Sequence, residues 1–95
     1  MEKHYAYMLQ CADGTIYSGY TTDLVRRTAA HNKGTGAKYT RARRPVLLAY
    51  HECFGTKNEA LRRESAFKKL SHKEKLELIE AFREHNNISQ ESESP

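Results

Sequence analysis

The sequence predicts an α+β fold, a three-stranded antiparallel sheet flanked by helices in the order β-β-α-β-α-α. Three observations predict it: two Tyr-containing apolar stretches joined by a turn, an apolar run that follows Pro45, and two capping-box patterns in the C-terminal half. Three strands are too few to enclose a core, so helices must cover the sheet. A chain of 95 residues is long enough for one domain, which we place at residues 1–85.

The first two strands are expected to form a hairpin. Residues 4–11 are rich in Tyr, Leu and Met, the sequence ADG follows as a turn, and residues 15–20 have the composition of a second strand. The strands alternate their side chains between two faces, so the turn decides which side chains share a face.

Two registers of this hairpin place the tyrosines differently. If the Asp-Gly pair alone forms the turn, Tyr17 pairs with Gln10 and lies on the opposite face from Tyr7. If Ala-Asp-Gly forms a three-residue loop with Gly14 left-handed, Tyr7 pairs with Gly19 and both tyrosines share one face. The sequence permits either register. We prefer the second, because a glycine inside a strand suggests the close approach of a ring, backbone or ligand.

One helix is expected before the third strand. Thr22 or Asp23 can cap it, and it should end near Asn32, before a loop that contains two glycines. Its inward stripe is expected to consist of Leu24, Val25, Thr28 and Ala29.

The C-terminal half predicts one strand, two helices and a tail. Pro45 opens the third strand, residues 46–54. Two pairs with capping-box spacing then start two successive helices: Thr56 with Glu59, and Ser71 with Glu74. The last ten residues, 86–95, are polar and hold no base, so we expect a disordered tail.

Positive charge is concentrated in the middle of the chain. The net charge of +4 rises to +6 without the last ten residues, which carry two of the 12 acids and none of the 16 bases. No Asp or Glu occurs between Asp23 and Glu52, whereas that interval holds seven bases: Arg26, Arg27, Lys33, Lys38, Arg41, Arg43 and Arg44. A charge run is often only a solvated surface, but this one would attract a polyanion, and we favour nucleic acid as the partner.

Membrane and secretory classes are not supported by the sequence. Apolar runs such as Val46 to Tyr50 are far shorter than the roughly 18 residues that cross a bilayer. The first residues lack the basic region and apolar core of a signal peptide, and two cysteines are too few for a disulfide scaffold. We therefore expect a cytoplasmic protein with no membrane association.

Glu64 is a charged residue at the edge of an apolar pattern. The inward stripe of its helix is expected to consist of Ala60, Leu61, Phe67 and Leu70, and Glu64 lies on or beside it. Either this carboxylate pairs with a neighbouring arginine such as Arg63, or it ligates a metal, since a buried carboxylate is costly without a cation or donors.

Arg27 and His31 pose a similar choice in the preceding helix, where they lie four residues apart. Both side chains could simply be solvated. Alternatively, an arginine near two phenols and an inward carboxylate is suited to neutralising the charge that develops on a phosphodiester.

These motifs together resemble those of the GIY-YIG nuclease superfamily. YAYML followed by IYSG is similar to the paired motif that names it, with YAY in the place of GIY and YSG in the place of YIG. Arg27 lies ten residues after Tyr17, as the helix arginine of the family does, and LRRESAF resembles the segment with its metal-binding glutamate. DGTIYSGYTTDLVRR, HNKGTGAKYT and RRPVLLAYHE resemble the small stand-alone bacterial members, the UPF0213-like proteins, and the likeness covers residues 4–80.

The resemblance implies hydrolysis of phosphodiester bonds in DNA with one divalent cation, Mg²⁺ or Mn²⁺. Carried over by position, it implies a tyrosine pair, a phosphate-stabilising residue, a metal ligand and two auxiliary residues, which are respectively Tyr7 and Tyr17, Arg27, Glu64, and His31 and Tyr39. Contacts to nucleic acid are expected from one basic segment: Lys33, Lys38, Tyr39, Arg41, Arg43 and Arg44.

One departure from the family pattern keeps other functions open. Many of these nucleases have an asparagine about a dozen residues after the glutamate, whereas this chain has Leu76 at that distance. The chain could therefore be a catalytically weak or inactive nucleic-acid-binding module. A third interpretation is a structural or partner-binding domain that uses its charged C-terminal helix.

Overall fold

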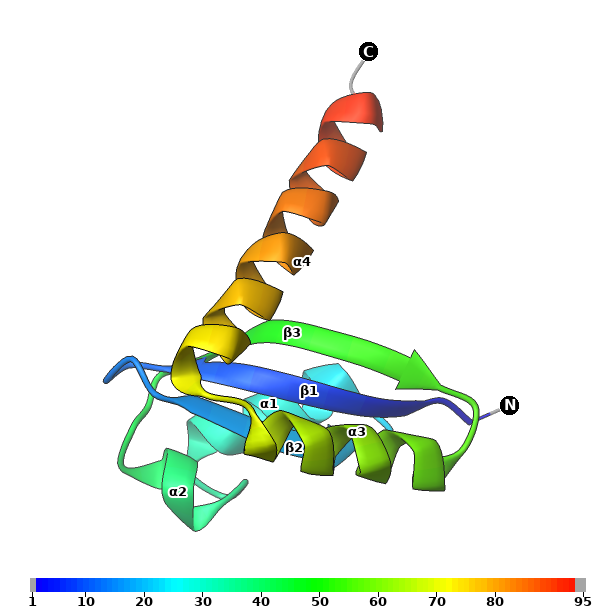
Figure 1. Ribbon diagram of the computed structural model, residues 1–95. Helices are drawn as coiled ribbons and strands as arrows, with labels where there is room; N and C mark the ends of the chain where they lie inside the picture. The colour runs from blue at the N-terminus through cyan, green and yellow to red at the C-terminus, as the bar shows by residue number, and fades with distance from the viewer. Residues whose placement is uncertain (1, 94–95) are drawn as a thin grey trace.

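The computed structural model describes residues 2–93, with side chains described up to Asn86. Its centre is an antiparallel sheet of three strands in the order β2-β1-β3, so the first strand is the middle one (Figure 1). The elements in chain order are β1 (His4–Cys11), β2 (Ile16–Thr21), α1 (Leu24–Lys33), α2 (Lys38–Arg41), β3 (Val46–Phe54), α3 (Lys57–Lys69) and α4 (His72–Glu93). The predicted α+β fold is confirmed, and the short helix α2 is an addition to it.

The β1–β2 hairpin has the register that places both tyrosines on one face. Tyr7 pairs with Gly19 and Leu9 pairs with Tyr17. Gly14 in the turn has φ 86°, the left-handed conformation that a three-residue loop with a bulge requires. The preferred register is therefore confirmed, and the two-residue turn is excluded.

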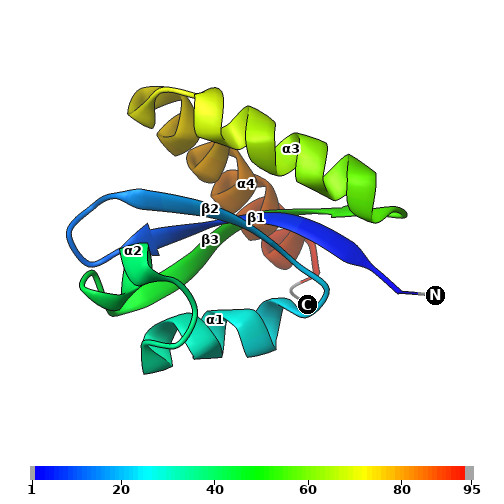
Figure 2. The same cartoon turned by 90° about the horizontal axis from the view of Figure 1, so that it is seen from below.

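Helices cover both faces of the sheet, with α1 on one side and α3 on the other (Figure 2). Ala6 and Met8 of β1 face α3 and α4, where they pack in a core with Phe67 and Ile79. Side chains of alternate β1 residues, including Tyr7 and Leu9, form a second core on the α1 face. The side chain of Tyr7 therefore lies between the sheet and α1.

The predicted inward stripe of α1 was partly wrong. Val25 is 82% exposed and Ala29 is also exposed, whereas His31 is fully buried. The buried side of the helix is turned toward Leu24, Arg27 and His31. Gly36 in the loop after α1 accepts from the arginine, and Tyr7 of β1 and Thr40 of α2 hydrogen-bond the histidine. A stripe chosen by hydrophobicity alone cannot anticipate this rotation.

Both predicted helix caps form, and at Ser71 the Glu74 side chain also accepts from the cap N–H, as a full capping box requires. The backbone N–H of Glu59 donates to Thr56 Oγ1 at 3.2 Å, and the N–H of Glu74 donates to Ser71 Oγ at 3.1 Å. Leu61, predicted to face inward from α3, is instead 36% exposed.

Helix α4 starts beside β3 and its later turns extend away from the sheet (Figure 1). Its helical bounds reach Glu93. The tail predicted for residues 86–95 falls almost entirely on residues whose side chains lie outside the description, and its disorder stays a prediction. No helix within residues 2–93 has both the length and the apolar composition needed to cross a membrane.

Candidate active site

A buried chain of three polar side chains joins β1, α1 and α2. The hydroxyl of Tyr7 lies 2.9 Å from His31 Nε2, and His31 Nδ1 lies 2.8 Å from Thr40 Oγ1. Tyr7 is 1% exposed, and His31 and Thr40 are fully buried. Buried polar groups of this kind are costly unless they are hydrogen-bonded, so the three residues stabilise one another in a fixed arrangement.

Two glycines make room for this chain. A Cβ on Gly19 would lie 2.5 Å from Cζ and from the hydroxyl oxygen of Tyr7, so the phenol ring lies directly across the β2 backbone. A Cβ on Gly36 would lie 2.5 Å from His31 Nδ1. The close approach that a glycine inside β2 suggested is the approach of the Tyr7 ring.

We expect the substitution Gly19→Ala to displace the Tyr7 ring and to lower the free energy of unfolding by about 1–3 kcal/mol, the usual cost of overpacking. Gly55→Ala is the matched control, because a Cβ at Gly55 has no neighbour within 4 Å. Urea unfolding of both variants tests this expectation. Equal stability of the two variants would show that the Tyr7 ring does not depend on the space at Gly19.

Tyr17 lies on the same face as Tyr7 and is half-buried. Its ring centroid is 5.2 Å from that of His31 and 5.8 Å from that of Tyr39. Tyr39 is 40% exposed and carries the guanidinium of Arg43 over its ring, 3.9 Å from the centroid. An aromatic row therefore leads from the buried histidine to the surface.

Arg27 brings a positive charge to this cluster. Its Nη2 donates to the carbonyl oxygen of Gly36 at 3.0 Å, which fixes the guanidinium against the loop that follows α1. Its Nε is buried and has no hydrogen-bond partner among the described residues. The guanidinium of Arg27 is positively charged and its Nε–H has no partner among the described residues. This side chain is therefore suited to contact a phosphate oxygen, which is an anionic acceptor. A pocket lined by Arg26, Arg27 and the residues at the start of α1 opens beside it.

Burial controls the protonation of the two hydrogen-bonded rings. Burial raises the pKa of Tyr7 above 10.0, and the neighbouring Arg27 guanidinium opposes that rise. Burial lowers the pKa of His31 below 6.5, and the charge of Arg27 lowers it further. At neutral pH, Tyr7 therefore keeps its proton and His31 is an uncharged imidazole.

Glu64 of α3 is the one predicted site residue that comes from the other face of the sheet. Its side chain is 17% exposed, and its carboxylate pairs with Lys68 Nζ at 3.1 Å. Arg63, the alternative partner in the sequence analysis, instead pairs with Glu52 at 3.0 Å. The charge of Glu64 also contributes to the rise in the Tyr7 pKa, so the carboxylate lies within electrostatic range of that hydroxyl.

The described residues of this site offer a divalent cation a single carboxylate, that of Glu64. No three His, Cys, Asp or Glu side chains gather into a metal-binding group in the part of the chain whose side chains are described. Mg²⁺ commonly binds one or two carboxylates and completes its shell with waters and substrate phosphates. The carboxylate of Glu64 can act as such a ligand. Its partner Lys68 is 60% exposed, so a cation can displace the lysine.

The basic segment, residues 33–44, wraps around the end of α1 through α2. Lys33 and Lys38 are exposed. The arginines also hold the segment together, because each donates to a backbone carbonyl oxygen: Arg41 to Gly34, Arg43 to Tyr39 and Arg44 to Arg41. Arg43 Nε additionally lies 3.1 Å from Asp13 Oδ2 in the β1–β2 turn.

The sequence of this chain is similar to a known protein family. The profile of the GIY-YIG catalytic domain matches residues 3–77. The chain belongs to the GIY-YIG family. This membership indicates a function of the nuclease type.

Relatives of this GIY-YIG chain are found in bacteria and archaea. It is 59% identical over 85 residues to a UPF0213 protein of Bacillus pumilus, covering 87% of each chain, and 56% identical over 76 residues to one of Halobacterium salinarum, covering 80% of this chain and 99% of the other. Among solved structures, a protein of E. faecalis determined by solution NMR is 48% identical with a TM-score of 0.57, covering 87% of this chain and 92% of the other. The fold described above is therefore the fold of these relatives.

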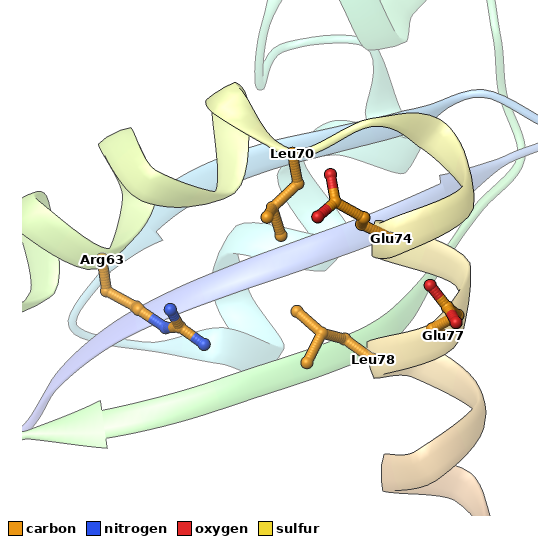
Figure 3. Close-up of a pocket in the computed structure, with 5 residues that line it drawn as sticks. All are labelled: Arg63, Leu70, Glu74, Glu77 and Leu78. Carbon is orange, nitrogen blue, oxygen red and sulfur yellow. The ribbon is translucent and has the colours of Figure 1, made fainter.

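A second pocket lies away from the tyrosine cluster of the GIY-YIG domain. It lies between α3 and α4 and is lined by Arg63, Leu70, Glu74, Glu77 and Leu78, with the two leucines projecting into it (Figure 3). None of the predicted site residues lines it, and Arg63 is already paired with Glu52. We therefore do not place the chemistry of the domain there.

The sequence analysis missed two residues that shape this GIY-YIG site. Thr40 supports His31, and Asp13 pairs with Arg43. The sequence contained no indication of the role of Thr40, because a single threonine in a basic loop forms no recognisable motif with its neighbours. Leu76, at the position where many family members have an asparagine, is 38% exposed on α4.

Proposed function

We propose that this protein hydrolyses phosphodiester bonds in DNA with one divalent cation. The observation that carries the proposal is the convergence of Tyr7, Tyr17 and His31 with the half-buried Arg27, which come from β1, β2 and α1. Two phenols, a neutral imidazole and an unsatisfied guanidinium donor within one cluster suit phosphoryl chemistry, where charge develops on oxygen atoms.

The roles of the side chains follow from their exposure. Tyr17 is the more exposed phenol, so we assign it the contact with the attacking water, whose proton its oxygen takes after its own hydroxyl proton has passed to solvent, aided by Tyr7. Tyr7 keeps its own proton and is held in place by its contact with His31 Nε2 at 2.9 Å. Arg27 neutralises charge on the phosphate oxygens.

Glu64 is the residue that would hold the cation. When bound, a divalent cation stabilises negative charge on the phosphate and on the leaving oxygen. Glu64 comes from the helix on the other face of the sheet, and its link to the phenols is the small contribution of its charge to the raised pKa of Tyr7.

The basic segment, residues 33–44, would bind the DNA backbone. Lys33 and Lys38 present exposed ammonium groups, and the arginines retain further N–H donors beyond those they give to carbonyl oxygens. Tyr39 offers an aromatic surface next to Tyr17. Such contacts give affinity that depends on salt but not on sequence.

A second candidate function is nucleic-acid binding without turnover. Leu76 favours it, because an exposed leucine replaces the amide that closes the site in many family members. In that case the basic segment would bind DNA with strong salt dependence and no requirement for metal. The cytoplasmic location stays a prediction in both cases.

Incubation of the protein with plasmid, single-stranded and branched DNA plus Mn²⁺ tests the proposal. We expect strand cleavage of at least one substrate, and none when the metal is chelated, because the cation supplies part of the charge stabilisation. A mobility-shift assay at two salt concentrations on the same samples measures binding separately. Salt-sensitive binding with no cleavage of any substrate would reject the nuclease in favour of the binding module.

A further inference from the structure

Thr40 is a fully buried polar residue at one end of the cluster, and it has no part in the proposed mechanism. Its hydroxyl oxygen lies 2.8 Å from His31 Nδ1 and 3.1 Å from the carbonyl oxygen of Ala37. Thr40 and His31 are both fully buried, so water does not compete for these bonds. Thr40 belongs to α2, which has only four residues and packs against α1.

The two contacts of Thr40 determine which nitrogen of His31 carries the proton. The carbonyl oxygen of Ala37 has no hydrogen, so the contact between the two oxygens needs the single hydroxyl hydrogen of Thr40. Thr40 can then only accept at its other contact, so Nδ1 of His31 must carry a hydrogen. A neutral imidazole has one N–H, which leaves Nε2 as an acceptor.

The surroundings of Tyr7 lead to the same assignment. The guanidinium of Arg27 lies beside the Tyr7 hydroxyl, and a guanidinium can only donate hydrogen bonds. The hydroxyl hydrogen of Tyr7 is therefore free for the other neighbour, Nε2 of His31 at 2.9 Å. The Thr40 end therefore requires the proton of His31 on Nδ1, and the Tyr7 end is consistent with it.

We propose that Thr40 is a positioning residue that holds His31 in its Nδ1–H tautomer, so that Nε2 accepts the hydroxyl hydrogen of Tyr7. The lone pairs of the Tyr7 oxygen then face Arg27 and the substrate side of the cluster. The consequence for catalysis depends on the proposed nuclease function, whereas the tautomer does not.

The tautomer is measured directly by long-range ¹H–¹⁵N correlation NMR of the full chain, at a pH where the His31 ring is neutral. A His31→Gln variant identifies the His31 signals. We expect the proton on Nδ1 in the wild-type protein and in Thr40→Ser, which keeps the hydroxyl. In Thr40→Val, which has a similar shape but no acceptor, we expect the proton to move to Nε2 and to be donated to Tyr7.

Two results would overturn the proposal: a proton on Nε2 in the wild-type protein, or an unchanged Nδ1–H in folded Thr40→Val. If Thr40→Val does not fold, the wild-type protein and Thr40→Ser still decide, because Nε2–H in either one contradicts the assignment.

The cleavage assay tests whether Thr40 matters for catalysis, independently of the tautomer measurement. We expect Thr40→Val to cleave DNA about 10- to 100-fold more slowly, the usual effect of removing a group that orients a functional histidine, and Thr40→Ser to cleave at nearly the wild-type rate. If the wild-type protein cleaves no substrate, the nuclease proposal is rejected. The NMR measurement then still tests the His31 tautomer, because it does not depend on cleavage. Equal cleavage by Thr40→Val and the wild-type protein would remove the catalytic part of the proposal.

Discussion

Replacing Glu64 by glutamine is expected to abolish cleavage dependent on Mg²⁺ or Mn²⁺ while the fold stays intact. Glutamine keeps the shape of the side chain but lacks the charge that a hard cation requires. The loss of several kcal/mol of charge stabilisation corresponds to a fall in rate of about 1,000-fold or more. Initial rates measured over a series of Mn²⁺ concentrations, with the fold verified by circular dichroism, test this expectation.

Lys68→Ala is the control for the Glu64 substitution. It removes the ion pair at 3.1 Å but leaves the carboxylate, and an i,i+4 pair whose lysine is exposed contributes at most about 1 kcal/mol to stability. We expect Lys68→Ala to retain cleavage. Cleavage that survives in purified Glu64→Gln protein would reject Glu64 as the metal ligand and would leave the tyrosine cluster without its proposed cation.

Arg27→Ala is expected to lower the rate of cleavage by about 100- to 1,000-fold, the usual effect of removing one preorganised donor that stabilises charge in the transition state. The buried and unsatisfied Nε, together with the charge that this guanidinium supplies to Tyr7 and His31, is the physical reason. The measurement is the rate under saturating DNA, so that weaker binding is separated from slower chemistry.

Arg26→Ala controls for the loss of one positive charge on α1. Arg26 is the exposed neighbour of Arg27 and lines the same pocket. We expect it to affect DNA binding slightly and the cleavage rate little. The assignment of Arg27 would be wrong if both variants lost the same amount of activity, because the effect would then come from overall charge.

Much of the framework could be predicted from local sequence patterns. The hairpin, the helix caps at Asp23, Thr56 and Ser71, and the strand after Pro45 each depend on residues that are close in sequence. A glycine inside β2 favoured the correct hairpin register, because only a close approach explains its position.

The orientation of α1 could not be predicted in the same way. Hydrophobicity placed Val25 inward, but the structure exposes it and buries His31. The histidine is buried because Tyr7 and Thr40, which are 24 and nine residues away in sequence, satisfy its two nitrogens. Periodicity along one helix contains no information about such distant partners.

The sequence alone predicted the order of the elements apart from α2 and the concentration of bases between Asp23 and Glu52. It permitted two registers of the hairpin and only favoured the one that places both tyrosines on one face, which the structure then decided. Only the tertiary structure decided that Thr40 reaches His31 and that Arg63 pairs with Glu52 of β3 rather than with Glu64. Capping, turns and strand alternation are short-range effects, whereas a buried hydrogen bond or ion pair depends on which distant surfaces the packed core brings together.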